Sequence, residues 1–375
     1  MAYFNNAATT YPKPQEVYSF MDEYNRKSGS EEGRGNTDGK LISQTRMLVK
    51  QILHCENKEV VFTPSNTIAM NMIIQGIIKA GGISNVYISP FEHNAVTRIL
   101  HVYREAINII LLPVKKSLEY DLNQINYDFD NEKPDLIIIS HASNVCGLIA
   151  PIEKIFACAK KHNAITVLDM AQTAGLIDID LNSQYIDYAV FAGHKTLYGP
   201  TGVSGFICTS SSSLSPVLFG GTGVDSLNQD MPRTIPEKFE MGTHNMGGIA
   251  GLYSALKWIQ SVSIAEIWKI EQRNKEKLLD ILQRYDNLKI VGYNPLLESV
   301  GVISVLFDGY SSESIGEVFK KHNVTVRTGL HCAPYAHQFL GTSPGGTVRF
   351  SISYFTTDED FEQLINILDY IEENG

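Results

Sequence analysis

Hydrophobic and polar positions follow two different patterns over the first two thirds of the chain. Short apolar runs typical of buried strands lie at residues 85–89, 107–112, 136–140, 165–169, 188–192 and 203–208. Apolar positions at helical spacing lie between several of these runs, at residues 67–79, 95–104 and 152–162. Strands that alternate with helices predict an α/β fold with a mostly parallel central sheet flanked by helices.

The pattern changes after a glycine-rich stretch at residues 242–251. A long amphipathic segment at 264–285 precedes predicted strands at 288–292, 302–307, 324–327 and 347–353 and predicted helices at 314–322 and 358–373. This order is typical of a smaller α+β unit with an antiparallel sheet. We therefore expect a large α/β domain over residues 16–258 and a small α+β domain formed by residues 1–15 and 259–375. A functional site is expected in the cleft between them.

Composition and charge narrow the function classes. The 375 residues include 31 Lys and Arg against 41 Asp and Glu, a formal net charge of −10. Binding to nucleic acid as the main activity would need a basic face, so this balance argues against it while allowing a local site for a small anion. No run approaches the roughly 20 apolar residues of a membrane span, and the N-terminus lacks the pattern of a signal peptide. The five scattered cysteines, without a CxxC pair, predict no disulfide framework and a cytoplasmic location.

Two charged residues stand at the ends of predicted strands, where ligands bind in such sheets. Lys195 follows the strand at 188–192, and a buried lysine becomes neutral and can form a Schiff base. A solvated lysine in a surface loop is the ordinary alternative. Asp169 ends the strand at 165–169, and it needs a cationic partner if it is buried, such as a protonated pyridine nitrogen. Capping a helix is its alternative use.

Further polar groups fall in the same layer of the predicted sheet. Residues 140–147 directly follow another apolar strand. Residues 63–67 open a helix, where free N–H groups suit a phosphate, although plain N-capping is the commoner use of such residues. His93 also follows a strand, and it can either stack on a planar ligand or cap a helix.

The C-terminal unit contributes a possible nucleophile. Cys332 lies where a predicted strand breaks into a loop at Gly329. A thiol beside His331 and near Arg327 can have a lowered pKa, which a nucleophilic thiolate requires. The set of His331, Cys332 and His337 matches no common zinc spacing, so we expect no metal site there.

Arg349 and the other cysteines complete the candidates. Arg349 alternates with apolar neighbours, and it can bind a carboxylate bidentately or face water on an edge strand. Three cysteines lie in apolar helix or strand patterns and are interpreted as core residues: Cys55, Cys158 and Cys208. Cys146 is intermediate between a core residue and a site residue.

The order and spacing of these residues resemble the pyridoxal-phosphate enzymes of the class V aminotransferase family, and within it the cysteine desulfurases. Phe4-Asn5-Asn6-Ala7-Ala8-Thr9-Thr10 is similar to the family's N-terminal segment, and Arg327-Thr328-Gly329-Leu330-His331-Cys332-Ala333 is similar to its cysteine motif. The latter looks like the short-loop, selenocysteine-lyase-like branch. The resemblance implies the type I fold of pyridoxal-phosphate-dependent transferases, with pyridoxal 5'-phosphate as cofactor and a homodimer with shared active sites.

The resemblance also implies residue roles. The implied cofactor contacts come from Asn66, Thr67, His93, Asn144, Asp169, Gln172, His194, Lys195 and Thr243. Lys195 would hold the cofactor covalently and move the substrate Cα proton, Asp169 would keep the ring nitrogen protonated, and His93 would stack on the ring. Asn66, Thr67 and His194 would bind the phosphate, Gln172 the ring hydroxyl, and Thr243 the phosphate of the neighbouring subunit. The implied substrate contacts come from Ala8, Asn144 and Arg349.

In this interpretation L-cysteine becomes L-alanine and Cys332 takes the sulfur as a persulfide, for delivery to an acceptor protein or a small thiol and for iron–sulfur cluster assembly. Selenocysteine lysis, transamination or epimerisation on the same scaffold are the alternatives. A non-catalytic scaffold and a dinucleotide-binding dehydrogenase are less favoured, the latter because no G-x-G-x-x-G follows the early strands. The chain departs from the family pattern at Ala192, Pro64–Thr67, Asn94 and Leu330, which affects the phosphate grip and the setting of Cys332.

Overall fold

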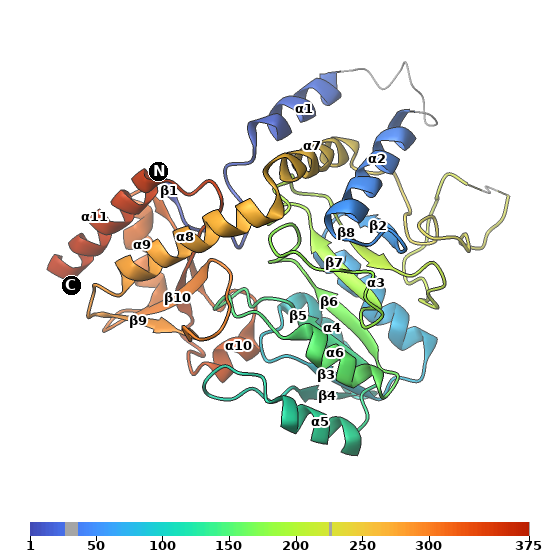
Figure 1. The fold of residues 1–375 in the computed structure, drawn as a ribbon, viewed down its shortest axis with the longest axis horizontal. Helices are drawn as coiled ribbons and strands as arrows, with labels where there is room; N and C mark the ends of the chain where they lie inside the picture. The colour runs from blue at the N-terminus through green and yellow to red at the C-terminus, as the bar shows by residue number, and fades with distance from the viewer. Residues whose placement is uncertain (27–36, 225–226, 375) are drawn as a thin grey trace.

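The computed structural model describes residues 1–26, 37–224 and 227–374 as a seven-stranded, a four-stranded and a two-stranded sheet with helices packed around them (Figure 1). The helices are α1 Gln15–Arg26, α2 Thr37–Ile52, α3 Asn66–Ala80, α4 Asn94–Val102, α5 Leu122–Asn131, α6 Ile152–Lys160, α7 Met246–Val262, α8 Ile264–Leu282, α9 Ser312–Lys321, α10 Pro334–Phe339 and α11 Asp358–Asn374. The strands are β1 Ala2–Tyr3, β2 Glu59–Thr63, β3 Asn85–Ile88, β4 Asn108–Leu111, β5 Leu136–Ser140, β6 Ile165–Asp169, β7 Tyr188–Ala192, β8 Ser204–Cys208, β9 Leu288–Val291, β10 Val302–Phe307, β11 Val324–Thr325, β12 Arg327–Gly329 and β13 Thr347–Ser351.

The large sheet has seven strands in the order β2-β8-β7-β6-β5-β3-β4. The strands from β7 to β4 pair in parallel, whereas β8 is antiparallel to both β7 and β2. The central strands β5, β7 and β8 are buried along their whole length, as expected for a sheet covered on both faces. The prediction of a mostly parallel α/β sheet is therefore confirmed.

The C-terminal third forms a second, antiparallel sheet in the order β12-β13-β10-β9. Its core includes side chains of α8, α9 and α11, together with Ala2 and Phe4 from the N-terminus. The N-terminal strand β1 pairs in parallel with β11, and Asn5 bridges to Ser351. Figure 1 shows α8 running from the end of α7 near the large sheet to the small one.

One predicted strand is wrong, one alternative for Arg349 is excluded, and some elements were not predicted. The single strand predicted at 324–327 is two strands, because β11 pairs with β1 while β12 turns away to pair with β13. Strand β13 lies between β12 and β10, so Arg349 is not on an edge strand and does not face water. The edge strand β2 and helix α5 were not predicted. The polar stretch of α5, Leu122–Asn131, buries only Ile125 and Phe129 and therefore carries little apolar signal.

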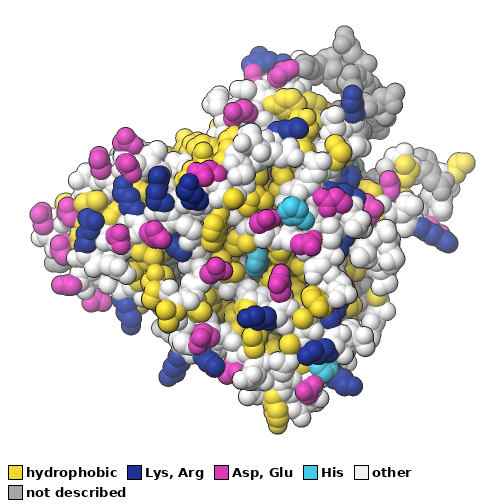
Figure 2. Space-filling view, in the orientation of Figure 1, with side chains coloured by type: hydrophobic (Ala, Val, Ile, Leu, Met, Phe, Trp, Pro, Cys, Tyr) yellow, Lys and Arg dark blue, Asp and Glu magenta, His cyan; other side chains and the backbone are white. Residues whose placement is uncertain are grey.

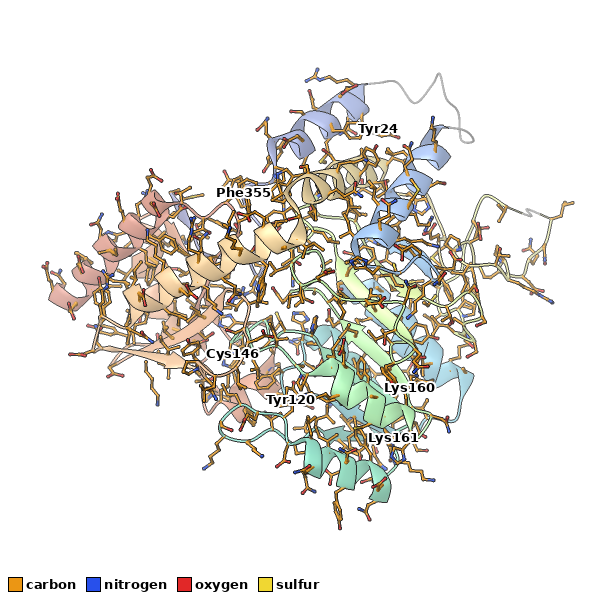
Figure 3. The ribbon with its side chains drawn as sticks, in the orientation of Figure 1. Tyr24, Tyr120, Cys146, Lys160, Lys161 and Phe355 are labelled. Carbon is orange, nitrogen blue, oxygen red and sulfur yellow. The ribbon has the colours of Figure 1, made fainter. Side chains whose placement is uncertain are left out.

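The cysteines form no disulfide, and most of them take part in packing. All five cysteines are free, and Cys55, Cys146 and Cys208 are buried. Cys146 lies where the loop after β5 meets the small sheet (Figure 3), and a Cβ on Gly292 would approach its Cβ to 2.8 Å. Burial raises the pKa of the Cys146 thiol, which assigns this residue to the packing between the two sheets.

Within the described ranges, no helix is both long and apolar enough to cross a membrane.

Candidate active site

A cavity of about 270 Å³ lies between the carboxyl ends of the parallel strands and the small sheet. It is lined by Ala7, Ala8, Ser65, Asn66, Thr67, His93, Ala95, Ser140, Ala142, Asn144, Asp169, Ala171, Gln172, Ala192, His194, Lys195, Arg327, His331, Cys332 and Arg349. The cavity thus brings together every site residue that the sequence suggested, except Thr243. That residue is exposed and lines a separate cavity beside Met241 and His244.

Lys195 follows β7 and borders the same cavity as Asp169. Burial lowers the pKa of Lys195 to about 8; the Asp169 carboxylate opposes this shift, whereas Arg349 and Arg327 add to it. About a tenth of the amine is therefore neutral at pH 7, far more than for an ordinary lysine, and the neutral form is the one that acts as a nucleophile or a base. The surface-loop alternative for Lys195 is wrong.

Asp169 is the last residue of β6 and is only 4% exposed. Its carboxylate accepts from the Ala171 backbone N–H at 2.9 Å and from Asn66 Nδ2 at 3.4 Å, and burial raises its pKa. Among the described residues no ion pair to Asp169 is found. A buried carboxylate at a cavity wall without an ion-pair partner is suited to a cationic ligand, such as a protonated ring nitrogen.

The start of α3 supplies polar groups to the same cavity. Ser65 is the N-cap, and its hydroxyl accepts from the Ile68 N–H at 3.3 Å, so the capping alternative is realised as well. Asn66 Oδ1 and His194 Nδ1 are buried without a hydrogen-bond partner. Burial and the nearby charge of Lys195 lower the pKa of His194 to about 4. The free N–H groups of this helix start and His194 Nδ1, when it carries the proton of the neutral ring, can donate to an anionic group such as a phosphate, whereas Asn66 Oδ1 can only accept.

His93 caps a helix, as one of its two alternatives predicted, and it also lines the cavity. Its Nδ1 accepts from the Ala95 N–H at 3.0 Å and caps α4, while the side chain also lines the cavity. Burial lowers the pKa of His93 to about 4, so the ring is neutral near pH 7 with its proton on Nε2. A neutral ring on a cavity wall is suited to contact with a planar ligand.

Gln172 and Asn144 connect the cavity to more distant parts of the chain. Gln172 Nε2 donates to the Ala7 carbonyl at 3.0 Å, which ties the N-terminal segment to the end of β6. Asn144 Nδ2 donates to the His331 carbonyl at 2.7 Å, and its own carbonyl accepts from Arg349 at 2.8 Å. Asn144 thus joins the large sheet to the loop that carries Cys332.

Arg349 lies on β13 and is only 2% exposed. Besides the Asn144 carbonyl, its guanidinium donates to Asn5 Oδ1 at 3.2 Å, and its Nε has no partner. Burial, together with nearby Arg327, lowers the pKa of Arg349 to about 9. No carboxylate pairs with it in the described part of the chain. Such a guanidinium is prepared to bind a carboxylate that enters the cavity.

Cys332 lies in a loop with a left-handed backbone. Its φ is 57°, that of His331 is 48°, and that of Gly329 is 91°. The Asn94 N–H donates to the Cys332 carbonyl at 2.7 Å, and Arg327 Nη2 lies 3.7 Å from its Sγ. Positive φ values are strained for residues with a Cβ, and such strain often marks a functional loop.

His331 does not face the thiol as its sequence position suggested. Its Nε2 meets Thr347 Oγ1 at 2.9 Å, and its ring packs on His337 with the centroids 5.4 Å apart. Burial and Arg349 lower the pKa of His331 to about 2, so the imidazole carries no charge that could stabilise a thiolate. Arg327 is therefore the cation beside Cys332. In the described part of the chain, no three His, Cys, Asp or Glu side chains are grouped to hold a metal ion.

Glu92 belongs to this site and was not suggested by the sequence. It is fully buried, and its carboxylate accepts from the Ser140 N–H at 2.6 Å, from Ser140 Oγ at 2.8 Å and from Ser89 Oγ at 2.7 Å. Burial raises its pKa to about 8. These bonds hold the turn before His93 against the end of β5. The only sign of this role in the sequence is that Glu92 is an acidic residue between Phe91 and His93.

Lys13 was also missed, because it lies far from the site in sequence. Its Nζ donates to the His194 carbonyl at 2.6 Å, and burial lowers its pKa to about 7. Thr10 Oγ1 donates to the Lys195 carbonyl at 3.0 Å. The N-terminal segment therefore holds the backbone of the loop that carries Lys195.

Comparison with known proteins places this geometry in a family. The model of the family described as "Aminotransferase class-V" matches residues 2–364. A probable cysteine desulfurase from Haemophilus influenzae is 30% identical over 98% of this chain and 85% of that protein, and one from Pyrococcus abyssi is 28% identical over 98% and 93%.

Solved structures give the same answer for the fold. A cysteine desulfurase from Escherichia coli superposes with a TM-score of 0.86 at 24% identity, covering 99% of this chain and 94% of that one. The apo structure of a cysteine desulfurase from Thermococcus onnurineus gives 0.84 at 24% identity, covering 100% and 95%.

Proposed function

Because the chain belongs to the class V aminotransferase family, whose members depend on pyridoxal phosphate, we propose that it is a cysteine desulfurase that forms a persulfide on Cys332. The single observation that carries this proposal is that one cavity joins Lys195, Asp169 and Cys332. The fold, type I of the pyridoxal-phosphate-dependent transferases, is the one that cysteine desulfurases share.

The residues present fit the cofactor. The N–H groups of the helix start at Thr67 and a protonated His194 Nδ1 can donate to its phosphate, and the unpaired Asp169 suits its ring nitrogen. Gln172 would reach the ring hydroxyl, and His93 would lie against the ring. Bound through Lys195, the cofactor supplies an electron sink that weakens the bonds at the substrate α-carbon and the bond to its sulfur.

The chain's own residues then divide the remaining work. Arg349, with Asn144 and Ala8 nearby, binds the substrate carboxylate and orients L-cysteine. The Lys195 amine takes and returns the Cα proton, for which a pKa of about 8 is well matched. The Cys332 thiolate attacks the substrate sulfur, so that a new S–S bond forms while the Cβ–S bond breaks. L-cysteine and the Cys332 thiol thereby become L-alanine and a Cys332 persulfide.

The molecular setting is part of the proposal. The large domain comprises residues 16–258 and the small domain residues 1–15 and 259–375, with the site between them. Two chains form a homodimer in which Thr243 of each contributes to the phosphate site of the other; the exposure of Thr243 outside its own cavity supports this. The enzyme works in the cytoplasm and delivers sulfur to an acceptor, for iron–sulfur cluster assembly.

Mass spectrometry of the purified protein after incubation with L-cysteine tests the activity. We expect the mass of one added sulfur atom on the peptide that contains Cys332, together with free alanine. The Cys332→Ala variant loses the adduct but keeps the cofactor, which borohydride fixes to Lys195. Cys146→Ala is the matched control, because this buried thiol lies outside the cavity and its loss leaves the adduct in place.

Two results would overturn the proposal. One is normal desulfuration by Cys332→Ala. The other is transfer of the amino group from the substrate to a keto acid without any sulfur on the enzyme.

A further inference from the structure

Cys332 borders two hollows of the molecule. One is the cavity shared with Lys195, and the other is a groove of about 390 Å³ that runs outward between α3 and α4. Thr67, His93 and Ala95 also line both. The thiol therefore lies at a boundary, with the reacting groups on one side and a path to the surface on the other.

The groove follows α4 from its first residue to its last. Besides the shared residues, it is lined by Asn71, Gln75, Asn94, Arg98, Ile99, Val102 and Tyr103. Since α4 has nine residues, the groove is roughly 12 Å long at 1.5 Å per residue. An extended peptide of about four residues has this length.

The walls of the groove are held in place without a ligand. Tyr103 Oη donates to Gln75 Oε1 at 3.1 Å and so connects the end of α4 to α3. At the inner end, the Asn94 N–H binds the Cys332 carbonyl at 2.7 Å. A groove that is already formed binds its ligand without the cost of ordering its own side chains.

Charge and polarity along the groove select its occupant. Arg98 is exposed, and among the described residues it has no ion pair or hydrogen bond; no acidic side chain lines the groove. The groove therefore carries a positive charge although the whole chain has a net charge of −10. Acidic and basic side chains are intermixed on the face drawn in Figure 2. At the outer end, Val102 is 71% exposed and offers an apolar contact. An acidic segment with an apolar residue is complementary to both features.

We propose that this groove receives a thiol-bearing acidic segment of an acceptor protein, with Arg98 as its recognition residue. The inference rests on the proposed persulfide chemistry. The acceptor thiolate attacks the outer sulfur of the Cys332 persulfide, a new S–S bond forms on the acceptor, and Cys332 leaves as a thiolate. No oxidant or reductant is consumed. The length of the groove and its apolar outer end favour a peptide segment over a small thiol.

The test loads the holoenzyme with L-cysteine, removes the substrate and measures transfer of sulfur to three probes. These are the peptides Gly-Asp-Cys-Asp-Val and Gly-Lys-Cys-Lys-Val and the small neutral thiol 2-mercaptoethanol. We expect Arg98→Glu to lower the ratio of acidic-peptide to basic-peptide rates roughly tenfold, because it replaces an attraction by a repulsion. The effect should fade in 0.5 M salt, where exposed charges are screened.

Arg104→Glu is the matched control, since it makes the same charge change just past α4 but outside the groove. It should leave the ratio within about twofold, and transfer to 2-mercaptoethanol should stay within about twofold in both variants. The proposal would be overturned if Arg98→Glu and Arg104→Glu gave equal ratios of acidic-peptide to basic-peptide rates. It would also be overturned if Arg98→Glu slowed transfer to 2-mercaptoethanol as much as transfer to the acidic peptide. If no persulfide forms on the wild-type enzyme, the proposed function itself fails, and that result is seen before any acceptor is added.

Discussion

The two walls of the active-site cavity are built in different ways. The large-domain wall carries Lys195 and Asp169 at the ends of the adjacent strands β7 and β6, whose parallel pairing sets Asp169 opposite Val190. The small-domain wall carries Cys332 on a loop in which Gly329, His331 and Cys332 all have positive φ. One wall is held by a buried sheet, and the other by a strained loop with a few hydrogen bonds.

This difference matches what each wall has to do. The lysine and the aspartate must keep a constant position relative to a bound ring, because small misplacements are costly in catalysis. The cysteine must reach the substrate sulfur on one side and a second thiol on the other, which requires limited movement. The loop is nevertheless guided, since the Asn94 N–H and Asn144 Nδ2 bind its carbonyls. The comparison teaches that rigidity is concentrated on the cofactor side.

The largest expected effect comes from the rigid wall. Lys195→Ala should lower alanine formation from L-cysteine by at least about 10³-fold, because the covalent anchor and the proton-moving amine are lost together. Amino-acid analysis at saturating substrate and added cofactor measures this. Lys13→Ala is the control, because Lys13 donates to the His194 carbonyl and to Thr10 Oγ1 without lining the cavity, and this variant should retain the borohydride-fixed adduct. If Lys195→Ala kept more than a tenth of the activity, the catalytic role given to Lys195 on the rigid wall would be contradicted.

An intermediate effect is expected from the small-domain wall. Arg349→Lys should raise KM for L-cysteine about 10- to 100-fold and change kcat by less than about fivefold, because lysine keeps the charge but loses the two-pronged contact to a carboxylate. Steady-state kinetics measure the split, and thermal unfolding checks that the variant folds. Arg327→Lys, on the same wall near the Cys332 sulfur, should instead slow sulfur transfer with little change in KM. An unchanged KM in Arg349→Lys would remove Arg349 from substrate binding.

The smallest expected effect is a pH dependence of the empty enzyme. With a pKa of about 8, the neutral fraction of Lys195 rises about tenfold between pH 7 and pH 9 and then levels, whereas an ordinary lysine would gain about 100-fold. The rate at which apo protein captures pyridoxal phosphate, followed by absorbance, should show this plateau. The same reaction with a free lysine derivative corrects for the cofactor's own ionisation. A rate that keeps rising beyond pH 9 would mean that Lys195 is solvated.

Local patterns predicted most of the large sheet. Six of its seven strands, β3 to β8, lie within one residue of the apolar runs seen in the sequence. Helix α5 was missed because it is mostly polar, whereas strand β2 was missed although Val60, Val61 and Phe62 form a buried apolar run. The split between β11 and β12 was missed for a different reason. It depends on which partner each residue meets, namely Ala2 for Val324 and Arg349 for Arg327.

The candidate site shows the same division. Lys195, Asp169 and Cys332 were suggested by their residue types at strand ends and by the family resemblance, and all three line the cavity. Glu92 and Lys13 were not suggested, since their importance comes from contacts with residues 48 and 181 positions away. The cation beside Cys332 was assigned in part to His331, but the fold turns that ring toward Thr347 and leaves Arg327 near the sulfur.

The sequence by itself determined the class of fold, the membership of the family and the chemical groups available, because periodicity and motifs are local properties of the chain. Only the tertiary structure decided which of these groups meet and in what state. It paired Asn144 with the cysteine loop, left Asp169 without an ion-pair partner and lowered the pKa of Lys195, because burial and long-range contacts arise only when distant segments pack together. It also forms a groove beside Cys332 that no pattern along the chain predicted.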